Sequence, residues 1–436
     1  MFGRTLTACS IFLIFAIPVR ADGPSGRVVK DSTALLAVAS ATPPTAASTQ
    51  ALQQQPAGFT SWPTLTGTWG GARPAMESAG LTFSAMYRSD QISNISGGQE
   101  ARGVSINQLD LQLAIDGDAA IGIHGLALFA HVIANNGSSV SRWVGDAQIV
   151  SNLESTRLAK LYQFWVRQSF LDDHASVLAG LYDLNAEFYA NDAAGLFLNS
   201  SFGVGKELAQ AGLNGPGIYP NPALTLRLRG EWDGYYTQAA VLDGHPGVPE
   251  DPFVPSFAWT KDEGVLIIAE AGRVSDGSEG GFCSKFSVGA WWMPSSPEMP
   301  LPNGGAYLIA EQQLYREDGA NQGLTLFSRM GVADLRVNRF RANLSGGAVY
   351  VGPIPGRNDD KLGLGITLAQ RNELLDGDDA TALFQRSGEI SVELSYRIQL
   401  MASVAIQPDL QYVIGPGCAP EIDNASVFGV RFEGHF

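Results

Sequence analysis

Hydrophobic and polar side chains alternate along this chain from Leu81 to its last residue. The alternation is clearest at the C-terminus, where one face carries Phe428, Val430, Phe432, Gly434 and Phe436. The side chains between them are Gly429, Arg431, Glu433 and His435. A strict period of two is typical of β-strands that have one apolar face and one polar face. The pattern therefore predicts an all-β structure.

The alternating segments can be counted, and the count favours a closed barrel. They start near residues 81, 105, 124, 160, 175, 222, 234, 263, 284, 305, 322, 338, 361, 387, 403 and 426. An even number of strands places both ends of a bacterial barrel on the same side of the membrane. We expect a closed antiparallel transmembrane β-barrel of sixteen strands.

Alternation alone does not distinguish a barrel in lipid from a β-sandwich, whose apolar faces cover each other. Three features favour lipid. The segments are about ten residues long, as a tilted membrane strand requires. The chain stops on an aromatic residue at the end of an amphipathic strand, as bacterial outer-membrane barrels do. Aromatic residues lie toward strand ends, where interface girdles are expected, at Tyr87, Trp165, Tyr235, Trp291, Trp292, Tyr315, Tyr412 and Phe436.

The connections between the predicted strands alternate between short and long. Short turns such as 171–174 are expected on the periplasmic side and long loops outside. The longest connection, 184–221, is the third outer loop, and we expect it to fold into the lumen. Cys283 falls at the periplasmic rim and Cys418 in the last outer loop, so both are predicted to be free thiols.

The first 80 residues differ from the rest of the chain. Residues 1–21 have the charged start, the apolar run and the small-residue end of a signal peptide. Residues 22–60 are rich in Ala, Pro, Thr and Gln, which predicts a disordered linker. Residues 61–80 are expected to form a periplasmic segment with a short helix at 72–79. The barrel is predicted to occupy 81–436, and no stretch of 18 apolar residues follows the signal.

Composition excludes several classes of function. A net charge of −15 argues against nucleic acid as a partner. The chain has only five histidines, without metal-ligand spacing on a helix and without a Gly-x-Ser-x-Gly elbow. We therefore expect neither an enzyme nor a bound cofactor. The carboxylate pairs Asp359-Asp360 and Asp378-Asp379 occupy turn-like contexts, and calcium at an outer loop stays open.

Several motifs, in the same order along the chain, resemble the carbohydrate-selective porin family of the OprB type. They run from about Leu65 to Phe436. The most informative are Leu65-Thr66-Gly67-Thr68-Trp69-Gly70-Gly71, Ala179-Gly180-Leu181-Tyr182-Asp183-Leu184-Asn185-Ala186-Glu187-Phe188, Leu196-Phe197-Leu198-Asn199-Ser200-Ser201-Phe202-Gly203, Ala310-Glu311-Gln312-Gln313-Leu314-Tyr315 and Gln407-Pro408-Asp409-Leu410-Gln411-Tyr412.

The resemblance implies passive diffusion of mono- and disaccharides through a sixteen-stranded porin. It also implies the outer membrane of a Gram-negative bacterium, with lipid and lipopolysaccharide around a monomer or homotrimer. Two alternatives stay open. One is a general or weakly ion-selective pore, and the other is a secreted β-sandwich that binds glycans.

Strand parity identifies inward-facing residues that could contact a sugar. A neutral polyol needs planar hydrogen-bond donors and acceptors, which arginine, carboxylate and amide groups supply. For any single residue, a solvated wall or a cross-strand ion pair explains the same position. The candidates for the constriction are Arg88, Asp110, Arg227, Arg229, Arg341 and Arg397 on strands, with Asp183, Asn185 and Glu187 at the start of the long loop. The same parity places Glu393, Asp409 and Gln411 inside.

Overall fold

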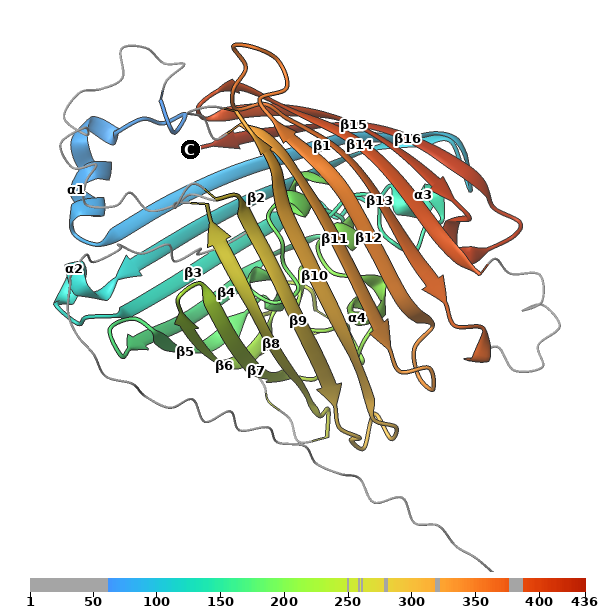
Figure 1. Cartoon of the computed structure of the whole chain (residues 1–436), viewed down its shortest axis with the longest axis horizontal. Coiled ribbons are helices and arrows are strands. Elements are labelled where there is room, and N and C mark those ends of the chain that lie inside the picture. The colour runs from blue at the N-terminus through green and yellow to red at the C-terminus, as the bar shows by residue number, and fades with distance from the viewer. Residues whose placement is uncertain are drawn as a thin grey trace, which may run out of the picture. The chain divides into compact units, whose positions relative to one another are not determined.

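The computed structural model describes residues 62–248, 251–257, 259, 262–277, 281–317, 322–375 and 387–436. The expected signal peptide, the 22–60 linker and the pair Asp378-Asp379 lie outside these residues. Sixteen antiparallel strands form one closed barrel, in which each strand pairs with its neighbours in sequence and β1 pairs with β16 (Figure 1). The predicted barrel is confirmed. The β-sandwich alternative is wrong, because a single sheet closes on itself.

The sixteen strands begin within three residues of their predicted starts. They are β1 (Leu81–Gly98), β2 (Arg102–Asp116), β3 (Leu126–Asn135), β4 (Leu158–Phe170), β5 (Ala175–Tyr182), β6 (Ala223–Trp232), β7 (Tyr235–Asp243), β8 (Val265–Asp276), β9 (Cys283–Met293), β10 (Asn303–Arg316), β11 (Gly323–Ala333), β12 (Phe340–Val351), β13 (Lys361–Arg371), β14 (Gly388–Met401), β15 (Val404–Ile414) and β16 (Asp423–His435). Period-two patterning located the strands because each has one apolar face.

All helical pieces of the described residues are short. They are η3 (Trp69–Gly71), α1 (Ala72–Ser78), α2 (Gly117–Ile121), α3 (Ser141–Val144), η4 (Leu184–Ala186), η5 (Ala193–Leu196), η6 (Ser200–Phe202), α4 (Lys206–Ala209), η7 (Glu373–Leu375) and η9 (Pro416–Cys418). The helix expected at 72–79 corresponds to α1. Within the described part of the chain, none of these helices combines the length and apolar character needed to cross a membrane.

The barrel is closed at its short-turn end by contacts between the two ends of the sheet. Met86 of β1 pairs with His435 of β16. The backbone N–H of Phe436 donates to the Ala85 carbonyl at 2.8 Å, and Leu65 N–H donates to the His435 carbonyl at 2.7 Å. The segment before β1 is therefore joined to the last strand by a backbone hydrogen bond.

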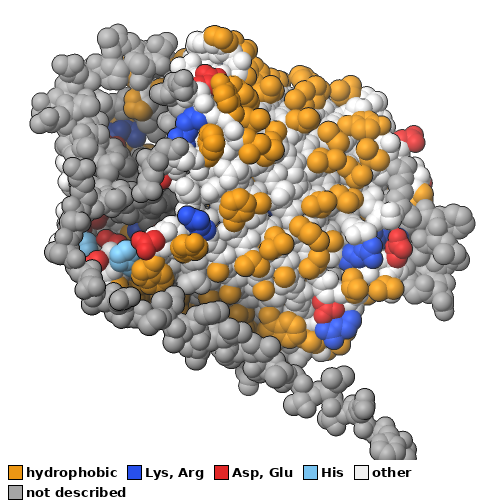
Figure 2. Space-filling view, viewed as in Figure 1, with side chains coloured by type: hydrophobic (Ala, Val, Ile, Leu, Met, Phe, Trp, Pro, Cys, Tyr) orange, Lys and Arg blue, Asp and Glu red, His pale blue; other side chains and the backbone are white. Residues whose placement is uncertain are grey.

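The outer face of the wall is apolar. Its outward positions expose large hydrophobic side chains on almost every strand, among them Phe164, Leu228, Val288, Leu308, Leu344, Leu364, Leu394 and Leu410. On the face seen in Figure 2, charged side chains gather toward the two ends, and the wall between them is apolar or uncharged. Soluble proteins rarely expose so much contiguous apolar surface. The outer face is therefore suited to hydrocarbon.

The predicted aromatic girdle is right in part. Tyr235, Trp292, Tyr315 and Tyr412 are exposed on the outer face, whereas Trp165 and Trp291 are buried inside the barrel. Trp165 stacks on Phe129, with ring centroids 5.2 Å apart. Since Trp291 and Trp292 are adjacent on one strand, they must face opposite sides of the sheet. The girdle prediction was wrong for these two tryptophans.

Inward-facing glycines make room for the long connection between β5 and β6. A Cβ atom placed on Gly365 of β13 would lie 2.7 Å from Phe202 Cζ and 3.0 Å from Phe197 Cε1. A Cβ on Gly363 would lie 2.6 Å from Leu196 Cδ2. The inner face of β13 is therefore flat enough for the rings of this loop to pack directly on the sheet.

Replacing Gly365 by Val should dislodge this part of the loop. The added side chain would overlap the rings of Phe197 and Phe202, and such overpacking costs about 1–3 kcal/mol. We expect faster proteolysis of the loop and altered single-channel conductance. Gly195→Ala is the matched control, because a Cβ at Gly195 meets no atom within 4 Å. Wild-type behaviour of Gly365→Val would contradict this contact.

The two predicted free thiols are confirmed and differ in accessibility. Cys283 is exposed at the start of β9, and Cys418 is buried in the outer connection before β16. Burial raises the pKa of the Cys418 thiol to about 11, with the negative charge of Glu389 adding to the shift.

In a Cys9→Ser background, a maleimide should label the folded barrel at Cys283 alone. Cys418 should react only after unfolding, because thiol attack requires an accessible thiolate. Mass spectrometry of labelled Cys283→Ser and Cys418→Ser variants measures this. Labelling of the folded Cys283→Ser variant would disagree with the buried position of Cys418.

Candidate functional site in the barrel lumen

The connection 183–222 lies inside the barrel and is organised by its own side chains. The Asp183 carboxylate accepts a hydrogen bond from Asn185 N–H at 2.9 Å, and Asn199 Oδ1 accepts one from Ser201 N–H at 3.0 Å. Each of these caps begins one of the short turns η4 and η6. Phe188, Tyr189 and Leu208 are fully buried against the barrel wall. The loop therefore forms much of the core of this molecule.

Carboxylates on three strands bind backbone N–H groups of this loop. Glu393 of β14 accepts from Leu198 at 2.5 Å and Asn199 at 3.0 Å. Glu270 of β8 accepts from Tyr189 N–H at 3.0 Å, and Glu311 of β10 accepts from Ala193 N–H at 3.0 Å. These carboxylates anchor the loop across the lumen.

A first charged cluster lies on the wall of β6 and β7. Arg227 makes a bidentate pair with Glu187 of the loop, at 2.8 Å from Nε and 2.7 Å from Nη2. Its neighbour on the same face, Arg229, pairs with Glu231 and donates to Gln238 Oε1 at 2.7 Å. The structure therefore places the start of the loop against Arg227.

Electrostatics of the loop carboxylates follow from their partners. Burial by itself raises the pKa of Glu187, but the charges of Arg227 and Arg229 lower it below its ordinary value. Burial raises the pKa of Asp183, and the hydrogen bond from the Tyr162 hydroxyl, at 2.5 Å, opposes that rise only in part. Glu187 is thus held as an anion, while burial disfavours the anion of Asp183.

A second charged cluster lies on the wall formed by β1, β2 and β3. Arg88 Nη2 lies 2.9 Å from Asp110 Oδ2, and His131 Nε2 lies 3.0 Å from Asp110 Oδ1. Gln108 donates to the same carboxylate at 3.0 Å, and its own carbonyl accepts from the Tyr219 hydroxyl at 2.7 Å. The cluster thus links the strand wall to the end of the loop.

The second cluster continues onto β14 and β16. Arg397 of β14 pairs with Glu433 of β16 at 2.9 Å, and Glu433 is the cross-strand partner of Arg88. Arg431 pairs bidentately with Asp90 at 2.7 and 2.8 Å. Guanidinium and carboxylate groups therefore alternate around this part of the wall.

The remaining predicted residues have other roles. Asn185 donates to the carbonyls of Phe188 and Gly203, at 3.2 and 3.1 Å, so it shapes the loop. Arg341 is half-buried beside a bulge in β12 and belongs to neither cluster. Glu393, Asp409 and Gln411 are inside the barrel as predicted, but they are buried against the loop.

Sequence reasoning missed several residues that complete the clusters. His131, Arg431 and Glu433 face inward by the same parity that identified Arg88 and Arg397. Tyr219 carries no periodic signal, because it lies in the long connection. Its contact with Gln108 could be found only in three dimensions.

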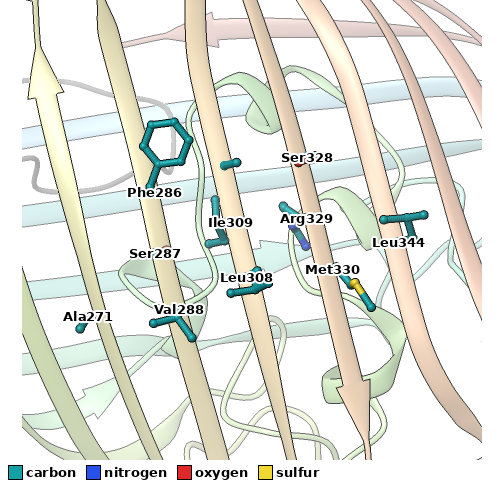
Figure 3. Close-up of a pocket in the computed structure, with 11 residues that line it drawn as sticks. Ala271, Phe286, Ser287, Val288, Leu308, Ile309, Ser328, Arg329, Met330 and Leu344 are labelled. Carbon is teal, nitrogen blue, oxygen red and sulfur yellow. The ribbon is translucent and has the colours of Figure 1, made fainter.

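Grooves on the outer wall are not part of this site. One of them, shown in Figure 3, lies over Ala271 and is bordered by Phe286, Val288, Leu308 and Met330. These four side chains are exposed on the lipid-facing side of the barrel. The groove is therefore suited to acyl chains and lies outside the lumen.

No three His, Cys, Asp or Glu side chains of the described residues form a group that could hold a metal ion. Asp360 belongs to the carboxylate pair Asp359-Asp360. Its carboxylate accepts hydrogen bonds from Arg357 at 2.5 Å and from the Tyr396 hydroxyl at 2.6 Å. Calcium at an outer loop stays a prediction.

Comparison with known proteins agrees with the barrel geometry. Porin B of Pseudomonas aeruginosa is 25% identical over 433 residues, which cover 85% of this chain and 90% of that protein. The high-pH structure of Pseudomonas putida OprB has a TM-score of 0.76 at 22% identity, covering 87% of this chain and 100% of that one.

The low-pH structure of the same protein has a TM-score of 0.59 at 18% identity, covering 86% of this chain and 99% of that one. Both structures support the barrel fold. The sequence profile of the carbohydrate-selective porin, OprB family, matches residues 102–436, which is most of the chain. With its closed barrel, apolar outer wall and charged lumen, this chain belongs to the OprB family of carbohydrate-selective porins in the Gram-negative outer membrane.

Proposed function

We propose that mono- and disaccharides diffuse passively through this barrel, along a path narrowed by the loop 183–222 and by paired arginines and carboxylates. No catalytic step is involved in this proposal. The path lies within one chain, so the same proposal holds for a monomer or for each subunit of a homotrimer. Outer-membrane lipid, including lipopolysaccharide, would surround the apolar wall.

Exposure separates the arginines that can meet a solute from those that stabilise the structure. The side chains of Arg229, Arg397 and Arg88 are 22%, 20% and 14% exposed inside the barrel. Arg227, by contrast, is 1% exposed and fully used by Glu187 and Ser176. We therefore assign solute contact to the first three residues and loop anchoring to Arg227.

Charge balance at these arginines carries the proposal. Each exposed guanidinium has a carboxylate partner, Glu231 for Arg229, Glu433 for Arg397 and Asp110 for Arg88. A balanced pair offers fixed donors and acceptors to hydroxyl groups, and attracts an ion less than an unpaired charge would. This arrangement favours a neutral polyol over an ion.

Replacing Arg229 by Ala should weaken sugar block and alter single-channel conductance. A hydrogen bond to a charged group contributes about 1.5–3 kcal/mol, so we expect roughly tenfold or more weaker block in a planar bilayer. Arg336→Ala is the control, because Arg336 is exposed in the connection between β11 and β12 and pairs with Asp334.

Unchanged conductance and sugar block in both Arg229→Ala and Arg397→Ala would remove these residues from the path. Measured reversal potentials distinguish a sugar-preferring porin from the alternative of a general or weakly ion-selective pore. A strong preference for one ion sign, together with equal liposome swelling rates for sugars and other solutes of similar size, would favour that alternative.

Stability of the seated loop should depend on pH through Glu207 of α4. Burial raises the pKa of Glu207 to about 7, although the Tyr189 hydroxyl donates to it at 2.9 Å. A carboxyl whose folded-state pKa is raised stabilises the fold below its ordinary pKa, and this stability is lost as pH rises toward the folded value. The denaturation midpoint should therefore decrease as the pH is raised from about 4.5 to about 7. Glu207→Gln should make the denaturation midpoint less dependent on pH in this range. An unchanged pH dependence in this variant would refute the role of Glu207.

A further inference from the structure

One part of the outer wall does not share its apolar character. Five neighbouring outward positions of β1 and β2 are polar and uncharged, and we call them the polar strip: Ser89, Gln91, Ser93, Ser105 and Asn107. Strands elsewhere on the wall expose Leu, Val, Ile or Phe at most such positions. Of the strands that the structure describes, only β1 has three successive uncharged polar side chains on its outer face. The polar strip therefore interrupts the surface that faces lipid.

Strand register places the polar strip among apolar side chains. On β16, three strip residues have apolar outward-facing partners: Phe432 opposite Ser89, Val430 opposite Gln91 and Phe428 opposite Ser93. Along β1, the next outward residue toward the long loops is Ile95, which is 57% exposed. Toward the short turns, β2 exposes Leu109. Apolar residues therefore flank the strip at both ends and on its β16 side, so it lies at a depth where the wall meets hydrocarbon.

Hydrogen bonds within the polar strip leave some of its atoms unpaired. Gln91 Nε2 donates to Ser105 Oγ at 2.7 Å and to Ser89 Oγ at 3.0 Å. Ser89 Oγ in turn donates to Asn107 Oδ1 at 2.8 Å, and Asn107 Nδ2 donates to Ser105 Oγ at 3.1 Å. These bonds use the amide nitrogen of Gln91 but not its carbonyl oxygen. Among the described residues, Gln91 Oε1 and Ser93 Oγ have no hydrogen-bond partner.

Unpaired polar atoms at this depth need a partner that lipid does not supply. Acyl chains carry no hydrogen-bonding groups, and the polar groups of lipids lie in the headgroup region beyond the hydrocarbon. A polar atom left without a partner in hydrocarbon costs free energy. A second membrane protein, in contrast, carries polar side chains at the same depth, and transmembrane helices associate in this way through small residues and through Ser, Asn and Gln. The unpaired atoms of the strip therefore favour a protein partner over a lipid.

Symmetry identifies the protein partner that fits this face. A two-fold axis along the membrane normal, next to β1, brings residues of equal depth in two copies against each other. Gln91 and Ser93 of one copy then face Gln91 and Ser93 of the other, so each Ser93 hydroxyl can donate to Gln91 Oε1 across the axis. The strip carries no charge, so like charges do not meet there. A second copy of the strip thus supplies the hydrogen bonds that the first one lacks.

The shape of this face allows two barrels to approach closely. A groove runs along the strip and is lined by Gln91, Ser93, Gly103, Ser105, Phe428 and Val430, with the backbone of Ile92 and Val104 at its base. Gly103 has no side chain, and a Cβ atom there would lie 2.4 Å from Ser93 Oγ. The two-fold axis next to β1 brings β16 of one copy opposite β2 of the other, so the exposed Phe428 ring faces the low surface at Gly103 and Ser105. Each copy therefore supplies a ridge for the groove of the other.

We propose that two copies of this barrel form a two-fold dimer through the polar strips of their β1 and β2 strands. An assembly of three would join two different faces of each copy, whereas the strip is one face that fits itself. Each barrel keeps its own lumen in this dimer, so the inference is independent of the solute that passes through.

Subunit counting tests the stoichiometry. The full-length barrel, labelled with a maleimide dye at Cys283 in the Cys9→Ser background, is reconstituted at low density into vesicles of phosphatidylethanolamine and phosphatidylglycerol. We expect two photobleaching steps per wild-type particle. Gln91→Leu removes the unpaired acceptor and makes this part of the wall apolar, and Gly103→Phe fills the groove. Both variants should dimerise at least tenfold more weakly than the wild type.

Matched controls change outward positions on other strands. Thr237→Val on β7 removes an exposed hydroxyl, and Ala269→Phe on β8 adds a ring to the outer face. Both should dimerise as the wild type does. Heat-modifiable migration and wild-type conductance of single barrels verify the fold of every variant.

Disulfide cross-linking tests the face itself. Ser93→Cys and Leu394→Cys, each in a background in which Cys9 and Cys283 are replaced by Ser, place a thiol on the polar strip or on the apolar wall of β14. Oxidation in the same vesicles should link Ser93→Cys into dimers at least tenfold more than Leu394→Cys.

Several results would overturn the proposal. They are a single bleaching step for the wild type at every protein density, wild-type dimerisation of Gln91→Leu and Gly103→Phe, and equal cross-linking at the two cysteines. A trimer that Gln91→Leu leaves intact would overturn it too. So would a wild-type monomer that copurifies with a lipid lost in Gln91→Leu, because the lipid would then take the place of the second copy.

Discussion

In hydrocarbon, a backbone N–H or C=O group without a partner costs several kcal/mol, since no water replaces the missing hydrogen bond. An open sheet leaves such groups along both edges. Here β1 pairs with β16 over most of its length, from Met86 opposite His435 to Gly98 opposite Asp423. The ladder between the first and last strands removes the edges, and the remaining features of the molecule depend on the closed cylinder that results.

Closure creates an interior that must be filled or lined with polar groups. The loop 183–222 occupies a large part of it, and its backbone amides need acceptors there. Glu270, Glu311 and Glu393 supply them from three different strands. Glycines such as Gly365 leave space for its aromatic rings. Buried carboxylates in this lumen thus act first as loop anchors. In the proposed path, the residues left for a solute are those with partial exposure and balanced charge.

The inner and outer surfaces of the wall differ because each matches the medium that it faces. Inside, arginines are paired with carboxylates, as Arg397 is with Glu433. Outside, exposed apolar side chains such as Leu364 and Leu394 suit hydrocarbon. A charged group costs little free energy in the lumen, where it has a partner, and much on the lipid-facing side, where it would have none.

The sequence by itself determined the number and position of the strands, because each strand has one apolar face and thus a period of two. Parity also identified Arg88, Asp110, Arg229 and Arg397 as inward-facing. Parity says nothing of which residues meet across the lumen, since those contacts join segments far apart in the chain. Only the tertiary structure showed that Arg227 is buried in a bidentate ion pair with Glu187 and that Arg341 belongs to neither charged cluster. It also corrected the girdle prediction, which had overlooked that Trp292, and not Trp291, shares the parity of outward-facing Phe286 and Val288.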